Sequence, residues 1–125
     1  LTQYVVKLMS RTGGGSIVSI SSSAAIDANS GRSAYGASKA ALLCSTKALS
    51  REVGNLNIRA NIIAPGITKT DMISSMTEEV IDQTVKSVSL NRCGDPKEIA
   101  NACTFLLSDL SSYVTGQTIR VDGGM

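Results

Sequence analysis

Apolar positions along the chain switch between a helical period and the short runs that are typical of buried strands. Near the start they recur at i, i+3, i+4, i+7 and i+8, which predicts a helix over residues 1–11. The glycines at 13–15 end that helix, and the run SIVSIS at 16–21 predicts a short buried strand. A polar loop over 22–32 follows.

The longest helical stretch covers residues 33–53, and Gly54 stands where this helix is expected to end. Small residues make one stripe along it, and larger apolar residues make another. A helix that is apolar on two sides is buried on two sides. We therefore expect one side to face a sheet and the small-residue side to approach another helix, for example from a second subunit. The small stripe consists of Ala34, Ala37, Ala41, Cys44 and Ala48, and the larger one of Leu42, Leu49 and Val53.

Two further strands follow this helix. The run IRANIIA at 58–64 predicts a buried strand that ends at Pro65-Gly66, and residues 118–121 predict a last one. Strands that alternate with helices at these lengths predict βαβ units. The expected fold is therefore α/β, a parallel sheet with the order β-α-β-α-β and a leading helix.

Helical signals of unequal strength lie between the last two strands. Residues 70–88 are weakly helical, with a break expected at Ser74-Ser75. A stronger helix start is Asp95, which is followed by Pro96 in the first turn and by Glu98 three residues on.

Composition narrows the class of protein. The chain has 125 residues, one domain or a piece of one, and 42% of them are apolar, as in globular proteins. A net charge of +2 is too small to indicate a nucleic acid or a membrane surface as partner, and no apolar run reaches membrane-spanning length. The chain has no histidine, which excludes a Ser-His-Asp or Cys-His nucleophile built on it alone.

The cysteines lack CxxC spacing, which indicates reduced thiols and a cytoplasmic protein rather than a disulfide framework or a zinc site. Cys44 and Cys103 fall in apolar helical stripes, so we expect them to act as small hydrophobic residues. Cys93 lies in a loop and is the one to test for reactivity. The arginines are scattered and are expected to be solvated; they are Arg11, Arg32, Arg51, Arg59, Arg92 and Arg120.

Tyr35 and Lys39 are four residues apart on the long helix, so their side chains share one face. An ammonium stabilises a neighbouring phenolate, and such a Tyr can exchange a proton with a substrate oxygen near neutral pH. Ser22 follows the carboxyl end of a strand, where open parallel sheets bind ligands. A Tyr-x-x-x-Lys pair alone is more often an exposed pair on a helix, so its context decides.

That context resembles the short-chain dehydrogenase/reductase family over essentially the whole chain. Ser22 precedes Tyr35 by thirteen residues, which is the family's usual spacing. The matching segments are YGASKAA at 35–41, NIIAPG at 61–66 with the loop at 67–70, TGQ at 115–117 and VDGG at 121–124. Each segment is moderately specific, and together they occur in the family's order.

The resemblance implies a Rossmann-like doubly wound α/β fold, present as its C-terminal half. It also implies an NAD(P)-dependent oxidoreductase that transfers a hydride between NAD or NADP and a small-molecule carbonyl or alcohol. Tyr35 would be the general acid/base, Lys39 would stabilise its phenolate and hold the nicotinamide ribose, and Ser22 would orient the substrate oxygen. Metal ligation is not implied.

The same resemblance assigns cofactor contacts to the turn after the second strand. Pro65 and Gly66 would let the chain turn close to the cofactor. The backbone of Ile67 would meet the carboxamide, and Thr70 would lie near the diphosphate.

The family's glycine-rich dinucleotide turn is missing. The glycines at 13–15 fail G-x-G-x-x-G, because Val18 stands at the third position, and they precede a strand, so we interpret them as a helix-to-strand turn. The residue that selects NAD or NADP and the active-site Asn are missing too, and no cap precedes the first helix. We expect residues 1–125 to be the C-terminal part of one NAD(P)-binding Rossmann-type domain without its N-terminal dinucleotide-binding half, and this truncated chain alone to be inactive.

Within the family, segments 70–72 and 90–100 look most like 3-oxoacyl-(acyl-carrier-protein) reductases, a likeness shared by many sugar, alcohol and steroid dehydrogenases. A homodimer or homotetramer is expected, paired through helix 33–53 and the leading helix. The alternative is a truncated non-catalytic remnant that self-associates. A lyase or epimerase using the same Tyr-Lys pair is a third hypothesis.

Overall fold

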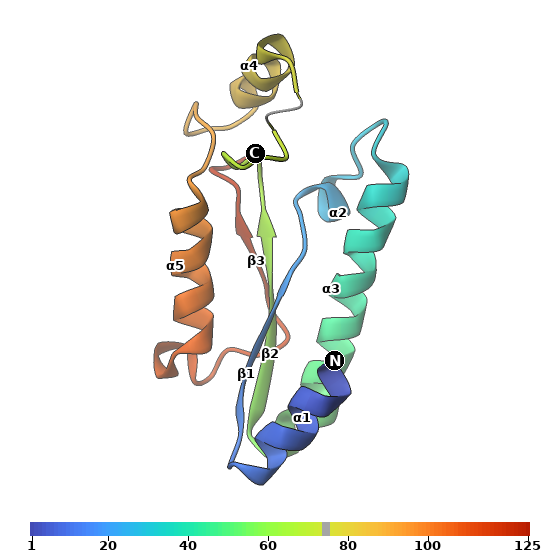
Figure 1. The fold of residues 1–125 in the computed structure, drawn as a ribbon, viewed down its shortest axis with the longest axis vertical. Coiled ribbons are helices and arrows are strands. Elements are labelled where there is room, and N and C mark those ends of the chain that lie inside the picture. Colours follow the sequence, from blue (N-terminus) through green and yellow to red (C-terminus); the bar gives the residue numbers. More distant parts are fainter. Residues whose placement is uncertain (74–75) are drawn as a thin grey trace.

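The computed structural model describes residues 1–73 and 76–125, and within these ranges strands and helices alternate as expected (Figure 1). The break expected at Ser74-Ser75 lies outside the described residues. The helices are α1 (Thr2–Arg11), α2 (Ala24–Asp27), α3 (Ser33–Val53), α4 (Glu78–Lys86) and α5 (Pro96–Leu107), with short 3-10 turns η1 (Gly54–Leu56) and η2 (Asp109–Ser111); the strands are β1 (Gly15–Ile20), β2 (Ile58–Pro65) and β3 (Thr118–Val121).

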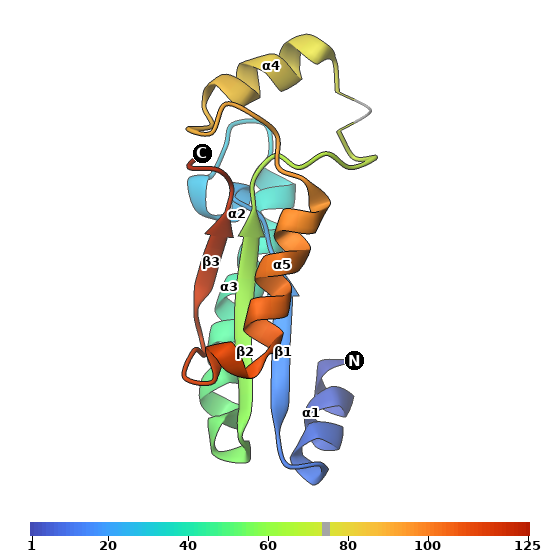
Figure 2. The ribbon, with the colours of Figure 1, turned by 90° about the vertical axis from the view of Figure 1, so that its left-hand side faces the viewer.

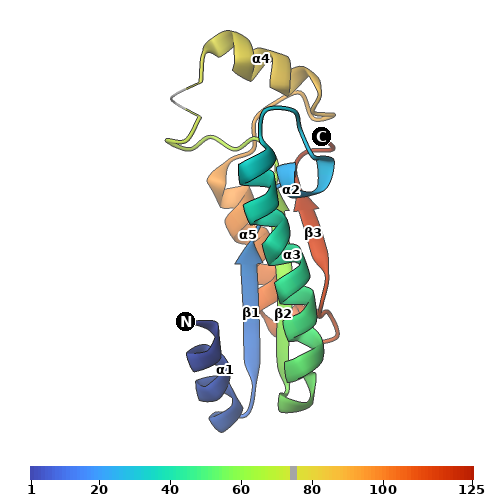
Figure 3. The ribbon, with the colours of Figure 1, turned by 90° about the vertical axis from the view of Figure 1, so that its right-hand side faces the viewer.

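The described strands form one parallel sheet in the order β1-β2-β3. Gly15 pairs with Ile58 at the start of β1, and Ile62 pairs with Thr118 at the start of β3. Helix α5 covers one face of this sheet (Figure 2), and α3 covers the other (Figure 3). The predicted doubly wound α/β fold with a leading helix is confirmed.

Strand β2 is the centre of the core because it has a neighbour on each edge and a helix over each face. Thr46 of α3 donates a hydrogen bond to Ser19 (2.8 Å), so Ser19 and its register partner Ile62 face α3. Ser16 donates to the Leu106 carbonyl oxygen of α5 (2.8 Å), which identifies the opposite face. Buried apolar side chains lie on both sides of β2; they include Ile58, Ala60, Ile62, Ile63 and Ala64.

Within this chain, helix α3 buries one side, which is the side expected to face the sheet. Its buried residues are Thr46, Ser50 and Val53. The whole small-residue stripe, including Cys44, is exposed. No described segment covers that face, so the expectation that the stripe, with Cys44, approaches another helix, for example from a second subunit, stays a prediction.

The end of α3 also differs from the prediction at Gly54. Gly54 keeps a right-handed helical conformation (φ −60°), and the chain continues through η1 to Asn57, which takes the left-handed conformation (φ 57°). Asn tolerates that conformation better than most residues do. The left-handed end therefore comes three residues later than expected.

Helix α5 begins with the predicted capping arrangement. The Asp95 carboxylate accepts a hydrogen bond from the Lys97 N–H (2.8 Å), and the Glu98 carboxylate accepts one from the Asp95 N–H (2.8 Å). Glu98 also accepts two hydrogen bonds from the Arg92 guanidinium, at 2.8 and 2.7 Å. These contacts lower the pKa of Glu98 to about 2, and the hydrogen bonds from Arg92 have the largest effect.

Stability should consequently depend on the ionisation of Glu98. Its pKa in the folded state lies below the ordinary value of 4.5, so the carboxylate stabilises the fold above about pH 4.5, and this contribution is lost as the pH falls toward 2. Glu98→Gln keeps a cap acceptor without the charge. We expect Glu98→Gln to be less stable than the wild type in urea unfolding at pH 7, with the difference narrowing steadily below pH 4.5. A difference that stays constant between pH 7 and pH 2.5 would contradict this assignment.

Arg59, which the sequence places at a solvated surface, is instead anchored to the end of α5. Its guanidinium donates to the carbonyl oxygens of Leu106 (2.9 Å) and Ser108 (3.1 Å) and to the Ser111 hydroxyl (2.9 Å). The last carbonyls of a helix lack partners within the helix, and a guanidinium has enough donors to serve several of them. Arg59 therefore fastens the end of α5 to β2.

The other two thiols differ in surroundings. Cys93 is buried, at 7% exposed, so the loop thiol proposed for a reactivity test is shielded from solvent. Cys103 is half-buried, and burial raises the pKa of its thiol, as expected for a cysteine packed among apolar residues. Among the described residues no three potential metal ligands cluster, and no helix there has the length and apolarity to cross a bilayer.

Candidate active site

A groove of about 1330 Å³ opens at the carboxyl ends of the strands and contains every residue that the sequence singled out for catalysis or cofactor binding. Open parallel sheets bind their ligands at this end. The candidates that line it are Ser22, Tyr35, Lys39, Pro65, Gly66, Ile67 and Thr70. They come from three separate parts of the chain, and the fold brings these three segments to one groove.

Ser22 is held from both sides along the backbone. The Ser21 N–H donates to the Ile63 carbonyl (2.8 Å), and the Ser23 N–H donates to the Pro65 carbonyl (2.8 Å), so the chain continues to follow β2 after β1 has ended. Ser22 lies between these two anchors, half-buried at the groove.

Tyr35 and Lys39 lie in the first turns of α3 on the groove side. The Lys39 ammonium lies 5.9 Å from the centre of the Tyr35 ring and donates a hydrogen bond to the Ile20 carbonyl (3.2 Å) at the end of β1. Tyr35 is 37% exposed, which leaves it accessible to a ligand. Gly36 next to it allows α2 to approach α3, because a Cβ there would lie 3.1 Å from the Ala24 carbonyl oxygen.

The Pro65-Gly66 turn brings β2 against the segment after β3. The Gly66 N–H donates to the Val121 carbonyl (3.1 Å), and a Cβ on Gly66 would lie 2.7 Å from the Cβ of Asp122. In this chain, the close approach that requires a glycine is therefore to Asp122. Whether the turn also meets a cofactor stays a prediction.

The loop that contains Ile67 and Thr70 is pinned to the start of α5. The Gly94 N–H donates to the Ile67 carbonyl, and the Lys69 N–H donates to the Gly94 carbonyl, each at 2.9 Å. The Thr70 hydroxyl donates to the Thr68 carbonyl (3.4 Å). Thr70 is exposed at the groove, while Ile67 is half-buried.

Sequence reasoning missed one wall of the groove. This wall is largely apolar and rises from the loop before α4, from α4 itself and from Met125; its apolar residues are Met72, Ile73, Met76, Val80 and Met125. Methionine adapts its shape to apolar ligands of varied outline. In the sequence, the only features that point to this apolar wall are the weak helical pattern of residues 70–88 and the methionines within it.

The groove presents polar side chains at the carboxyl ends of the strands. Ser22, Tyr35 and Lys39 offer hydroxyls and an ammonium that suit ribose hydroxyls and a substrate oxygen. The glycines at 13–15 lie at the opposite end of the sheet, between α1 and β1, where a Cβ on Gly14 would collide with the Asn57 carbonyl oxygen. They form the helix-to-strand turn that was predicted, and the described residues contain no glycine-rich strand-to-helix turn.

A parallel sheet covered on both faces, with a groove at its carboxyl ends, is typical of nucleotide-binding α/β proteins. A family model described as "Enoyl-(Acyl carrier protein) reductase" matches residues 1–125. The chain belongs to the short-chain dehydrogenase/reductase family.

Individual relatives agree with this assignment. A 3-oxoacyl-(acyl-carrier-protein) reductase from Chlamydia trachomatis is 46% identical over 121 residues, covering 97% of this chain and 49% of that protein. A 3alpha-hydroxysteroid dehydrogenase from Mediterraneibacter gnavus is 46% identical over 122 residues, covering 98% of this chain and 49% of that protein.

A solved structure gives the same result for the fold. The structure described as 7 alpha-hydroxysteroid dehydrogenase complexed with NADH and 7-oxo glycochenodeoxycholic acid superposes with a TM-score of 0.93 at 39% identity. The match covers 98% of this chain and 49% of that one. The chain thus spans about half the length of the relatives it matches.

Proposed function

We propose that this chain carries the acid/base centre of an NAD(P)-dependent oxidoreductase that interconverts a carbonyl and an alcohol. The observation that carries the proposal is the grouping of Ser22, Tyr35 and Lys39 around one groove at the carboxyl ends of the sheet. Membership of the short-chain dehydrogenase/reductase family supports it, as does the NADH named in the similar hydroxysteroid dehydrogenase structure.

The three side chains have distinct tasks in this proposal. The Tyr35 hydroxyl passes a proton to the carbonyl oxygen, or takes one from the alcohol. The Lys39 ammonium, 5.9 Å from the centre of the Tyr35 ring, would hold the ribose hydroxyls of the bound nucleotide beside it. The Ser22 hydroxyl donates a hydrogen bond to the same substrate oxygen and orients it. The bound nicotinamide would supply or accept the hydride.

The cofactor-binding part of the proposal concerns the loop after β2. Pro65 and Gly66 turn the chain at the groove, the backbone of Ile67 would hold the carboxamide, and Thr70 would lie near the diphosphate. The proposed cofactor is NAD or NADP, because the residues that would select between them do not occur in these 125 residues. That residues 1–125 are the C-terminal part of a single dinucleotide-binding domain is likewise our proposal.

The substrate class we propose is a 3-oxoacyl thioester, as for the 3-oxoacyl-(acyl-carrier-protein) reductase from Chlamydia trachomatis. The apolar wall with Met72, Met76 and Met125 suits an acyl chain. A hydroxysteroid is the competing substrate, supported by the equal identity to the 3alpha-hydroxysteroid dehydrogenase.

Assembly and location complete the proposal. We propose a homodimer or homotetramer in the cytoplasm, paired through the small-residue stripe of α3 and through α1. Helix α1 exposes Leu1, Tyr4 and Leu8, and an apolar face of this kind favours contact with another protein surface.

A non-catalytic remnant that self-associates is the second candidate. The observation in its favour is that β1 and β3 each pair only with β2 among the described residues, which leaves an unpaired edge on both sides of the sheet. Unpaired strand edges invite association with another chain.

Cofactor binding and turnover discriminate between the two candidates. The full-length gene product should be titrated with NADH and NADPH by fluorescence, and then assayed with a 3-oxoacyl thioester and with a 3-oxosteroid. We expect saturable binding of one dinucleotide and its oxidation in the presence of one substrate. Absence of dinucleotide binding by a folded, oligomeric protein would favour the remnant.

A further inference from the structure

The short helix α2 begins two residues after Ser22 and packs against the start of α3. It contains four residues, of which Ala24 is buried and Ile26 and Asp27 are exposed. Ala28 then takes the left-handed conformation (φ 53°), so the chain turns away immediately. A single helical turn does not hold itself in place, so its position depends on contacts with other elements.

The Ser22 hydroxyl is coupled to this helix through a hydrogen bond. The Ser22 oxygen accepts from the Ala24 N–H (3.2 Å), at the start of α2. At the other side of the turn, the Ile26 and Asp27 N–H groups both donate to the Ser23 carbonyl (2.9 Å each). A shift of Asp27 therefore moves the whole turn and, with it, the donor that orients the Ser22 hydroxyl.

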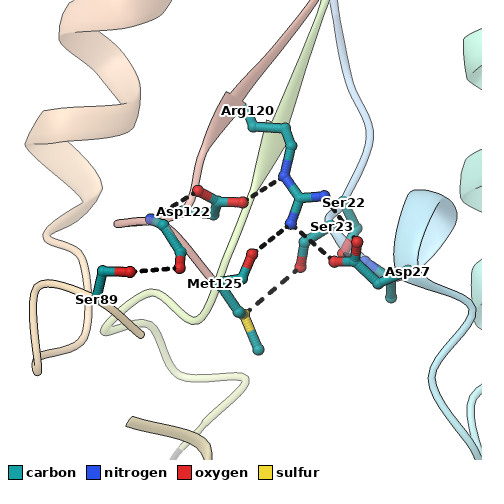
Figure 4. A network of polar contacts seen from close by, with 9 residues as sticks. Ser22, Ser23, Asp27, Ser89, Arg120, Asp122 and Met125 are labelled. Atoms are coloured by element: carbon teal, nitrogen blue, oxygen red, sulfur yellow. Dashed lines mark hydrogen bonds and ion pairs between the residues drawn. The ribbon is translucent and has the colours of Figure 1, made fainter. Parts of the chain in front are cut away.

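Besides the packing on α3, Arg120 of β3 provides a side-chain contact that holds α2 (Figure 4). Its guanidinium donates two hydrogen bonds to the Asp27 carboxylate, at 2.7 and 2.9 Å. Both side chains are only about one third exposed, at 32% and 31%. A two-pronged guanidinium–carboxylate pair fixes orientation as well as distance. This pair is therefore well suited to set the position of α2 relative to the sheet.

The remaining donors of Arg120 hold the segment after β3. Its Nε donates to the Asp122 carboxylate (2.5 Å), and a terminal nitrogen donates to the Met125 carbonyl (2.8 Å). Burial raises the pKa of Asp122, but the hydrogen bonds from Arg120 and from the Gly124 and Met125 backbones outweigh it and lower the pKa overall. Asp122 thus stays ionised opposite the guanidinium.

Met125 contacts the segment before α2 directly, because its sulfur accepts a hydrogen bond from the Ser23 hydroxyl (3.9 Å). Ser22, Ser23 and Met125 all line the groove. The Arg120 guanidinium therefore connects α2 with the segment after β3. Arg120 and Asp27 are 93 residues apart in the sequence.

We propose that Arg120 is a positioning residue for Ser22, acting through Asp27 and α2. The inference rests on the proposed function, since it assigns Ser22 its hydrogen bond to the substrate oxygen. Without Arg120, α2 loses its polar anchor, and the Ser22 hydroxyl samples directions that do not reach the substrate. Arg120 itself does not line the groove that contains Tyr35.

Arg120→Gln in the full-length gene product removes the charge and the two-pronged contact. We expect kcat to fall about tenfold while the KM for the dinucleotide changes less than about twofold. Asp27→Asn, which leaves Arg120 its contacts with Asp122 and Met125, should reproduce most of this loss. Arg92→Gln is the matched control, because it also removes a two-pronged pair with a carboxylate, that with Glu98, and lies outside this groove.

A double-mutant cycle separates positioning from a general loss of structure. In a Ser22→Ala background, Arg120→Gln should lower the residual kcat by less than about twofold, because the hydroxyl that it positions is gone. A full tenfold loss in that background, or no loss in the wild-type background, overturns the inference.

Hydrogen exchange tests the same inference without turnover, so its failure can be told apart from failure of the proposed function. A wild-type protein with no NAD(P)H-dependent activity refutes the function alone. In either case, Arg120→Gln should speed amide exchange in residues 22–28 about tenfold, and Arg92→Gln should leave that segment unchanged. Unchanged exchange in Arg120→Gln refutes the role of Arg120.

Discussion

Replacing Tyr35 with Phe is expected to lower kcat of the full-length gene product by about 100-fold or more, with dinucleotide affinity changed less than about twofold. Phe keeps the ring beside the Lys39 ammonium, which lies 5.9 Å from its centre, and removes only the hydroxyl. Proton transfer by a positioned side chain contributes about 10²–10⁴ to a rate, so its loss should appear in kcat. Steady-state kinetics and a fluorescence titration of the dinucleotide provide the two readouts.

Tyr113→Phe is the control for this substitution. Tyr113 is fully exposed and does not line the groove, so the same loss of a hydroxyl there should leave kcat within about twofold of the wild type. Normal turnover in Tyr35→Phe would show that Tyr35 is not the general acid/base, and the proposed role of the groove would then lack its proton donor.

The largest expected effect on stability is that of Ile62→Ala. Ile62 is completely buried in β2, with β1 and β3 on its edges and α3 over its face. Truncation there removes apolar contacts and leaves a cavity that the surrounding elements cannot fill, at a cost of about 2–5 kcal/mol in the free energy of unfolding. Urea unfolding of the full-length gene product measures it.

Ile62→Val provides the matched comparison, because it removes one methylene from the same position. Its expected cost is about 0.5–1.5 kcal/mol. If Ile62→Ala were no more destabilising than Ile62→Val, β2 would not be the central strand of a tightly packed sheet.

Local signals were sufficient for much of the fold. Asp95, Pro96 and Glu98 lie within four residues of each other, and their capping contacts are formed between neighbours in sequence, so the start of α5 could be predicted. The run at 58–64 is mostly apolar because β2 is covered on both faces. Such patterns reflect what each segment needs, whatever it packs against.

Partners distant in sequence were not predictable in this way. The stripe of small residues on α3 predicts that another helix packs closely against it. No described segment of this chain does so, and the stripe is exposed. Arg59 and Arg120 resembled solvated charges because their partners, Ser108 and Asp27, lie far away along the chain. Only the folded arrangement shows that they fasten elements together.

The candidate site was predictable through family resemblance rather than through physical spacing alone. Tyr35 and Lys39 share a helix face by their spacing, whereas Ser22 and the 65–70 turn reach the same groove only because parallel strands end at one edge. The apolar wall of methionines and the Arg120 network carry no local motif and needed the structure.

The central claim is that this chain provides the acid/base centre for hydride transfer from a nicotinamide. Its most direct test uses the full-length gene product with NAD(P)H deuterated at C4 and a 3-oxoacyl thioester, with the alcohol product analysed by mass spectrometry. We predict that the deuterium of one C4 position appears at the carbinol carbon, and that Tyr35→Phe forms this labelled product at least about 100-fold more slowly. Product formed without label, or labelled product formed equally fast by Tyr35→Phe, would contradict the account.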